Sequence, residues 1–295
     1  MDLVEISNKL GFTVAQPPST LDKTVRVIKE GLYYLSDIGW DDLPDDCYLN
    51  KQTCGCGATH LAITNDVNYV IASPYVRLIT NKVEQHGNIV AVHSTESDAK
   101  IKLKYDKLLS ENKPIKFMTT YEGVSRLMSF DWFSPKDFKL MVDEVHDIVN
   151  FGLFRKEAVT TILSSFMLFK NYVFVTATPN KEQFLPKQLI NVPHIELDWK
   201  SAKTVKINIQ KAKKNGNDFI VEKCRQYLHG EIDGNAHIFY NSVKEIVSVI
   251  KSLKKLPHYD SSQIKVVCAD NDYNNRTVKQ EGVGILSKSL LNSRK

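Results

Sequence analysis

The sequence lacks the features that mark membrane, secreted or repeat proteins. Its 295 residues contain no run of about 18 apolar residues, so no membrane span is predicted. The start, MDLVEISNKL, has neither the basic beginning nor the apolar stretch of a signal peptide. No internal repeat or low-complexity segment is found. A cytoplasmic protein is therefore expected.

Cysteine patterns are equally sparse. The chain has 5 cysteines, an odd number, and none forms a CxxC pair. Neither a disulfide framework nor a zinc site is expected, and a reducing compartment fits best. Cys54 and Cys56 flank a single glycine, but two lone thiols rarely make a metal site.

Positive charges exceed negative charges only slightly. The net charge is +5, with 42% hydrophobic and 25% charged residues, the balance of an ordinary globular protein. Lysines gather at 200–214, and the tail at 279–295 is basic. Such clusters are compatible with a nucleic-acid partner. Lysines that merely face solvent are common, however, and give the same sequence pattern.

Apolar runs rich in β-branched residues alternate with helix-like stretches. The expected strands are 46–51, 69–73, 89–93, 115–119, 140–143 and 172–176. NYVIAS and NYVFVTAT are nearly continuous apolar runs, which are typical of parallel strands buried on both faces. Helical patterns occupy 20–37, 94–112 and 154–169. This alternation predicts an α/β fold with a doubly wound parallel sheet.

The pattern loosens after residue 178. Pro179, Pro186 and Pro193 indicate a connection, so we expect a first domain over 1–180, a linker over 181–204 and a second, smaller domain over 205–295. The second domain offers strands at 205–210, 237–240 and 264–268, and helices at 219–228 and 242–256.

A glycine-rich segment, KQTCGCGATH, follows the first of these strands. A glycine turn brings backbone N–H groups together at a helix N-terminus, which suits a phosphate. Thr59 lies where a hydroxyl could bind Mg²⁺, but Ala58 occupies the position where the standard phosphate loop has lysine. An ordinary strand-to-helix turn would look the same.

Two further strands end in polar residues. LMVDEVHD places Asp143 and Glu144 at the carboxyl end of a strand, where α/β proteins bind ligands. Asp143 could hold a metal and Glu144 could orient or deprotonate a water, while His146 could link the site to a neighbouring lobe. VFVTATP ends in Thr176 and Thr178. Each segment alone could also be a plain strand exit.

Taken in order, GCGATH, DEVH and TATP resemble the nucleotide loop, acidic box and third motif of superfamily-two helicases, the DEAD/DEAH-box-like group. SPYVRL and FMTTYEG resemble two segments that contact the nucleic-acid backbone, and IFYNSV resembles the opening motif of the second lobe. The resemblance covers residues 21–270 and extends to divergent helicase-like proteins of bacterial viruses and mobile elements. It would place the protein in a bacterial or phage-infected cell.

The resemblance implies two RecA-like lobes of the P-loop NTPase type, with ATP and Mg²⁺ between them and nucleic acid, DNA favoured, across both. Nucleotide contacts would come from Thr53, Gly55, Cys56, Gly57, Ala58, Thr59, Thr176 and Thr178. Mg²⁺ would be held by Thr59 and Asp143, and catalysis would use Glu144, Asp143 and His146. Strand contacts are expected at Pro74, Arg77, Thr119, Thr120 and Ser242.

The sequence departs from the family in two places. Ala58 replaces the loop lysine, and Lys51 is the residue that could supply a cation from the other side of the loop; a solvent-facing strand end is the alternative. The motifs with arginines expected after residue 270 are missing, which predicts an incomplete second lobe, possible completion by another protein chain, and weak or absent ATPase activity of this chain alone.

Three functions are weighed against these features. The first is an ATP-dependent helicase or translocase. The second is a degenerate nucleotide-sensing module that binds nucleic acid together with a partner chain. The third, a P-loop kinase, needs neither the TATP strand nor a second βα lobe and has no support in the sequence.

Overall fold

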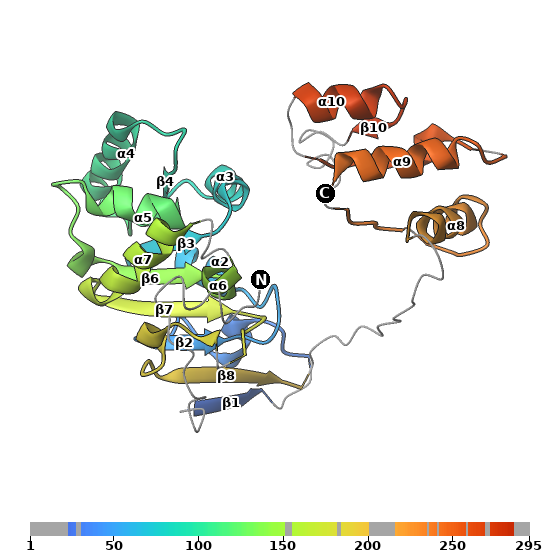
Figure 1. Cartoon of the computed structure of the whole chain (residues 1–295). Helices are drawn as coiled ribbons and strands as arrows, with labels where there is room; N and C mark the ends of the chain where they lie inside the picture. The colour runs from blue at the N-terminus through green and yellow to red at the C-terminus, as the bar shows by residue number, and fades with distance from the viewer. Residues whose placement is uncertain are drawn as a thin grey trace. The chain divides into compact units, whose positions relative to one another are not determined.

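The computed structural model describes residues 23–27, 31–150, 155–181, 184–200, 216–234, 236–240, 242–257, 259–268 and 272–285. The chain divides into two compact units, Met1–Thr204 and Val205–Lys295, drawn in Figure 1. No helix among the described ranges is long and apolar enough to cross a membrane.

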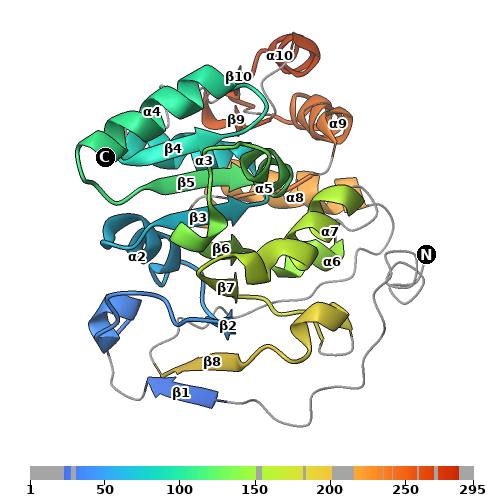
Figure 2. The same ribbon diagram turned by 90° about the vertical axis from the view of Figure 1, so that its left-hand side faces the viewer.

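The first unit is built on one sheet of eight strands, all parallel to their neighbours, in the order β1-β8-β2-β7-β6-β3-β5-β4. Figure 2 shows this order from β4 at one edge to β1 at the other. The strands are β1 Lys23–Val27, β2 Cys47–Asn50, β3 Tyr69–Ser73, β4 Ile89–Val92, β5 Lys116–Thr120, β6 Lys139–Asp143, β7 Asn171–Thr176 and β8 His194–Trp199.

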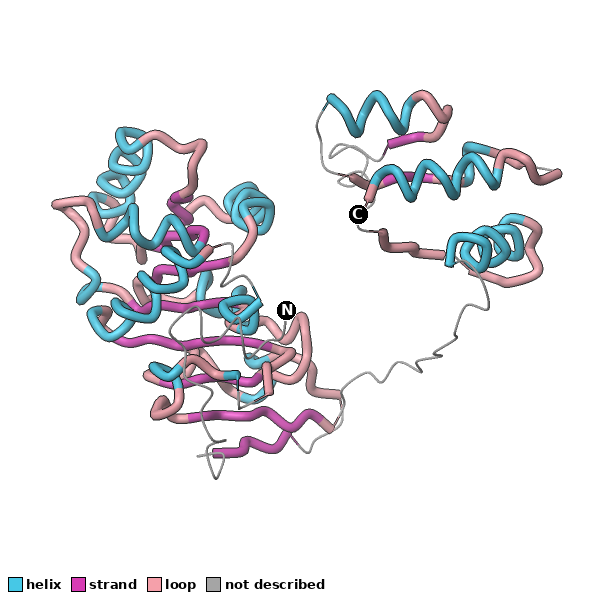
Figure 3. The backbone as a smooth tube through the Cα atoms, in the orientation of Figure 1, coloured by secondary structure: helices cyan, strands magenta, loops and turns pink. Residues whose placement is uncertain are grey.

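Helices cover both faces of the sheet, as Figure 3 shows in cyan. They are α2 Ala58–Thr64, α3 Val76–Gln85, α4 Asp98–Ser110, α5 Tyr121–Met128, α6 His146–Asn150 and α7 Lys156–Ser165, with short 3₁₀ turns η1 Leu35–Ile38, η2 Pro135–Asp137, η3 Phe166–Leu168 and η5 Lys187–Leu189. This architecture confirms the α/β class with a parallel sheet flanked by helices.

Alternate side chains of each strand enter two separate cores, because successive side chains point to opposite faces. In β3, Val70 and Ala72 pack with residues of α4, α5 and α7. Tyr69 and Ile71 pack with residues of α2, α3 and η1. Since both faces are buried, the central strands read as continuous apolar runs, which is why the sequence predicts them well.

Two predictions for this unit were wrong. The helix expected over 20–37 is replaced in its described part by β1 and the short turn η1. β1 is rich in β-branched residues, and it pairs with β8 from Lys23↔Ile195 to Val27↔Trp199. Conversely, β8 lies inside the segment expected to be a linker, and it pairs with β2 as well. The prolines mark turns before β8 and not a connection between units.

The second unit contains α8 Gly216–Leu228, α9 Val243–Leu253, η6 Ser261–Gln263, α10 Asp272–Lys279 and the two-stranded parallel sheet of β9 Lys265–Val266 and β10 Gly284–Ile285. Its small core joins Ile250, Val266, Val278 and Val283. The strand predicted at 237–240 is not formed, and the one predicted at 205–210 lies outside the described residues. That this unit is an incomplete RecA-like lobe remains a prediction.

Candidate nucleotide-binding site

The glycine-rich segment forms a turn from the end of β2 into α2. Gly55 and Gly57 have φ angles of 77° and 90°, in the left-handed region that glycine adopts without strain. Gly57 precedes the first residue of α2. The turn is braced from outside, because Leu35 N–H donates to the Cys56 carbonyl at 2.9 Å.

Side chains from both ends of this turn meet Asp143 at the end of β6. The Lys51 ammonium lies 3.5 Å from Asp143 Oδ1. The Thr59 hydroxyl donates to Asp143 Oδ2 at 3.2 Å. The Lys51 and Asp143 side chains are 7% and 11% exposed, so water screens their attraction only weakly. The glycine turn and the acidic strand end therefore form one site.

Lys51 is held in place through its backbone as well. Its N–H donates to the Thr176 carbonyl at 2.8 Å, which continues the pairing of β2 with β7. Its carbonyl accepts from Trp199 Nε1 at 2.9 Å. Burial alone would lower the pKa of Lys51, but the charges of Asp143 and Glu144 outweigh it, and the net pKa is raised. The amine therefore stays a cation, and the reading of Lys51 as a solvent-facing strand end is wrong.

The acidic turn after β6 has an unusual backbone. Glu144 has a φ of 53°, a region that costs a residue other than glycine about 1 kcal/mol or more. Several bonds stabilise it. The Tyr121 hydroxyl donates to the carbonyls of Asp143 at 2.7 Å and Glu144 at 3.0 Å. Val145 N–H donates to the Val175 carbonyl at 3.0 Å. The turn is thus fixed in a conformation that keeps Glu144 beside Asp143.

Glu144 itself is partly buried. Burial raises the pKa of its carboxyl group, the Lys51 charge lowers it in part, and the Asp143 charge raises it again. A carboxylate with a raised pKa is a better proton acceptor near neutral pH than an ordinary glutamate.

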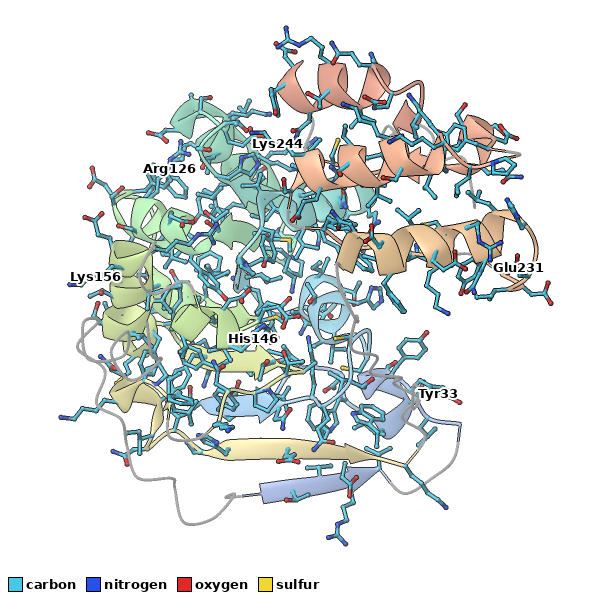
Figure 4. All side chains as sticks on the ribbon, turned by 45° about the vertical axis from the view of Figure 1, so that its right-hand side comes forward. Tyr33, Arg126, His146, Lys156, Glu231 and Lys244 are labelled. Atoms are coloured by element: carbon cyan, nitrogen blue, oxygen red, sulfur yellow. The ribbon has the colours of Figure 1, made fainter. Side chains whose placement is uncertain are left out.

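The His146 side chain, labelled in Figure 4, joins this turn to the end of β7. Its Nδ1 lies 3.0 Å from the Thr176 hydroxyl and 3.3 Å from the Thr178 hydroxyl. The same nitrogen is 3.3 Å from Glu144 Oε2. Thr176 Oγ1 also accepts from Thr178 N–H at 3.1 Å. The DEVH and TATP segments are therefore in direct contact.

The oxygen donors suit a small hard cation. A threonine hydroxyl and a carboxylate oxygen 3.2 Å apart are the kind of ligands that Mg²⁺ takes, with phosphate and water oxygens completing its shell. Within the described residues, no group of three or more His, Cys, Asp or Glu side chains could hold a metal by itself. A divalent cation at Asp143 would therefore need further oxygens, from water or from a ligand.

The other predicted loop residues lie in the turn without side-chain contacts to Asp143 among the described bonds. Cys56 and Ala58 are buried in the core beneath the loop. Burial raises the pKa of the Cys56 thiol. Thr53 N–H donates to the Lys51 carbonyl at 2.6 Å, which tightens the first part of the turn.

The residues predicted to contact nucleic acid differ in exposure. Arg77 is exposed on α3, next to buried Pro74. Thr119 and Thr120 are buried. The Thr119 hydroxyl donates to the Val92 carbonyl at 2.8 Å, and the Thr120 hydroxyl caps α5 by accepting from Gly123 N–H. Both threonine hydroxyls thus serve the fold.

Ser242 belongs to the second unit, where it precedes α9. It borders an open cavity of about 540 Å³, together with Tyr240, Lys244 and Tyr273.

Several site residues could not be found from the sequence. Trp199 and Tyr121 bond to the backbone of Lys51, Asp143 and Glu144, but nothing near them in the sequence marks that role. The position of Asp147 in the sequence does indicate a site residue, because it directly follows the DEVH segment.

Solved structures of three helicases match the chain at low sequence identity. No family model and no curated protein matches the chain. The Pyrococcus furiosus Hef helicase domain matches with 14% identity and a TM-score of 0.41, over 72% of this chain and 50% of that one. Mss116p bound to ssRNA and AMP-PNP matches with 12% identity and a TM-score of 0.48, over 90% and 67%. The yeast DEAD-box splicing factor Prp28 matches with 12% identity and a TM-score of 0.39, over 81% and 61%.

The chain therefore spans half of the Hef chain and between 61% and 67% of the other two. Matches of this strength assign no activity to it.

Proposed function

We propose that the first unit binds a nucleoside triphosphate, ATP in the first instance, with Mg²⁺, and that the protein is an NTPase of the helicase type. One observation carries this proposal. Lys51 and Thr59, at opposite ends of a glycine turn, contact the same carboxylate, Asp143. A cation, a hydroxyl and a carboxylate around a turn of backbone N–H groups form a set that fits a magnesium triphosphate.

Each residue has a role that its position supports. Lys51 would offset the charge of the outer phosphates, in place of the lysine that Ala58 replaces. Thr59 and Asp143 would hold Mg²⁺, which would draw electron density from the phosphate oxygens. Glu144 would orient the attacking water and accept its proton, because its raised pKa favours that transfer. Conformational changes at the nucleotide site would be transmitted to the rest of a motor through His146, Thr176 and Thr178.

Nucleic acid is the proposed partner. The turn into α3 begins at the same edge of the sheet as the site, because parallel strands all end at one edge. Arg77 is exposed there and could contact a phosphate. Phosphate contacts of this kind make binding tolerant of sequence and dependent on salt. DNA over RNA, completion by another chain, and an origin in phages or mobile elements remain predictions from the resemblance.

Equilibrium binding of a fluorescent ATP analogue, with and without Mg²⁺, tests the proposal. We expect Mg²⁺-dependent binding that Lys51→Ala weakens about 10- to 100-fold, since a charge-assisted contact contributes about 1.5–3 kcal/mol. Lys113→Ala is the matched control, because its side chain is 58% exposed and pairs with Glu111 far along the chain from the site.

Absence of binding, or equal binding by the Lys51 and Lys113 variants, would overturn the proposal. Binding without any phosphate release, even with single-stranded nucleic acid present, would favour the nucleotide-sensing module over the motor.

A further inference from the structure

Polar contacts continue beyond the proposed nucleotide site, from the acidic turn to the start of α3. Asp147 follows His146 and is buried, with 7% of its surface exposed. Its Oδ1 lies 3.6 Å from His146 Nε2. Its Oδ2 accepts from the Tyr75 hydroxyl at 3.4 Å. One buried carboxylate thus touches a site residue with one oxygen and the β3–α3 turn with the other.

His146 spans the gap between the two acids. While Nε2 faces Asp147, Nδ1 faces Glu144 and the Thr176 hydroxyl. The hydrogen bond made by one ring nitrogen decides which nitrogen carries the proton. The negative charge of Asp147 near Nε2 favours the tautomer with its proton on that nitrogen, in which Nδ1 accepts from Thr176. Asp147 therefore influences what His146 presents to Glu144 and Thr176.

At the other end, Tyr75 is in a position to meet a ligand. It is the residue that precedes α3, it is 48% exposed, and it stands two positions before Arg77. Burial raises the pKa of the Tyr75 hydroxyl, and the Asp147 charge raises it further, so the hydroxyl remains a donor. An exposed tyrosine beside an arginine is suited to stack on a base while the cation meets a phosphate.

Arg155 holds the turn in place. Its Nη1 donates to the Pro74 carbonyl at 2.8 Å, and its Nε lies 3.1 Å from Glu122 Oε1 on α5. Pro74 and Glu122 follow the carboxyl ends of the adjacent strands β3 and β5. With the backbone fixed in this way, the Tyr75 side chain is the part that can turn toward a ligand.

We propose that Asp147 is a positioning residue that couples the nucleotide site to single-stranded nucleic acid bound at the β3–α3 turn. The Tyr75 hydroxyl is the switching element, bonded to Asp147 in one state and released to the ligand in the other. Its release removes one contact of Asp147 while the contact with His146 stays, and the contacts of His146 with Glu144 and Thr176 then change. This inference rests on the proposed function and adds the residues through which the two sites communicate.

Coupling is a ratio of two affinities, so it can be measured apart from either one. The affinity for Mg²⁺ and a fluorescent AMP-PNP analogue is determined with and without a saturating oligothymidylate strand. We expect a ratio of about 5–50 for the unaltered protein. Tyr75→Phe and Asp147→Asn should each bring this ratio to about 1, with nucleotide affinity in the absence of DNA changed less than about threefold.

Tyr227→Phe, a half-buried tyrosine on α8, is the control and should keep the ratio. Tyr75→Phe removes one oxygen from an exposed side chain, so folding is not at risk even if Asp147→Asn proves unstable. A normal ratio in Tyr75→Phe, or a ratio of 1 in the unaltered protein, overturns the coupling while leaving nucleotide binding intact. Failure of the unaltered protein to bind nucleotide at all would instead remove the proposed function and this inference together.

Discussion

At the scale of single residues, Lys51 and Lys116 are both buried lysines in opposite electrostatic surroundings. Lys51 faces two carboxylates, which raise its pKa against the effect of burial. Lys116, at the start of β5, donates to Asn65 Oδ1 at 2.6 Å and to the Val67 carbonyl, which are neutral acceptors. Burial lowers the pKa of Lys116 to about 8, and the Asp42 charge opposes this only in part. The charged form is therefore favoured at Lys51 and disfavoured at Lys116.

This difference predicts a pH dependence of stability. Between pH 8 and the ordinary lysine range, Lys116 is neutral in the folded protein and charged in the unfolded chain, so the unfolded state binds more protons. The stability contributed by Lys116 therefore rises with pH. We subtract the free energy of unfolding of Lys116→Met from that of the unaltered protein, both measured by urea unfolding. This signed difference should be about 2 kcal/mol more positive at pH 10 than at pH 7.

Lys113→Met, at an exposed position near the same strand, should show no such growth. A signed difference, unaltered protein minus Lys116→Met, that stays constant or becomes more negative at higher pH would contradict the lowered pKa.

At the scale of elements, the glycine turn depends on a backbone conformation. Gly57 has a φ of 90°, while an added Cβ would meet only Tyr34 Cδ1 at 3.8 Å, an ordinary contact. Space is therefore not the constraint at this position. The constraint is the left-handed backbone conformation, which costs a residue with a side chain about 1–2 kcal/mol.

Gly57→Ala should lower the free energy of unfolding by about 1–2 kcal/mol, because Ala must either accept the strained φ or move the turn. Urea titration of the intact chain measures it. Gly87→Ala is the matched control, because an added Cβ there meets nothing within 4 Å and its φ is not positive. Equal stabilities for the two variants would show that the turn does not need the glycine.

The same scale shows what sequence patterns can and cannot predict. The central strands, including β3 and β7, were found because burial on both faces leaves continuous apolar runs. β1 and β8 were missed because they lie at one side of the sheet, where the apolar pattern is weaker and their pairing joins distant parts of the chain. Several site residues inside motifs can be predicted, but the roles of Trp199 and of Tyr121, which lies in the FMTTYEG motif, cannot, because both act by hydrogen bonds that depend on the tertiary fold.

At the scale of the whole molecule, the order of strands brings the first unit's motifs together. β7 lies between β2 and β6, so the strand ending in Thr176 separates the glycine turn from the acidic turn. Lys51 N–H bonds to Thr176 on one side, and Val145 N–H bonds to Val175 on the other. The eight-stranded sheet lies wholly within Met1–Thr204. The residues that meet at the proposed nucleotide site, from Lys51 to Thr178, therefore all belong to the first unit.

A double-mutant cycle tests most directly whether Thr59 and Asp143 act on one ligand. Mg²⁺-dependent affinity for the ATP analogue is measured for Thr59→Val, Asp143→Asn and the variant carrying both changes. Residues that share one ion are not additive, so we predict that each single change costs about tenfold or more and the double change about as much as the worse single one. Losses that multiply in full, or affinities that none of the three variants changes, would contradict a shared magnesium triphosphate site.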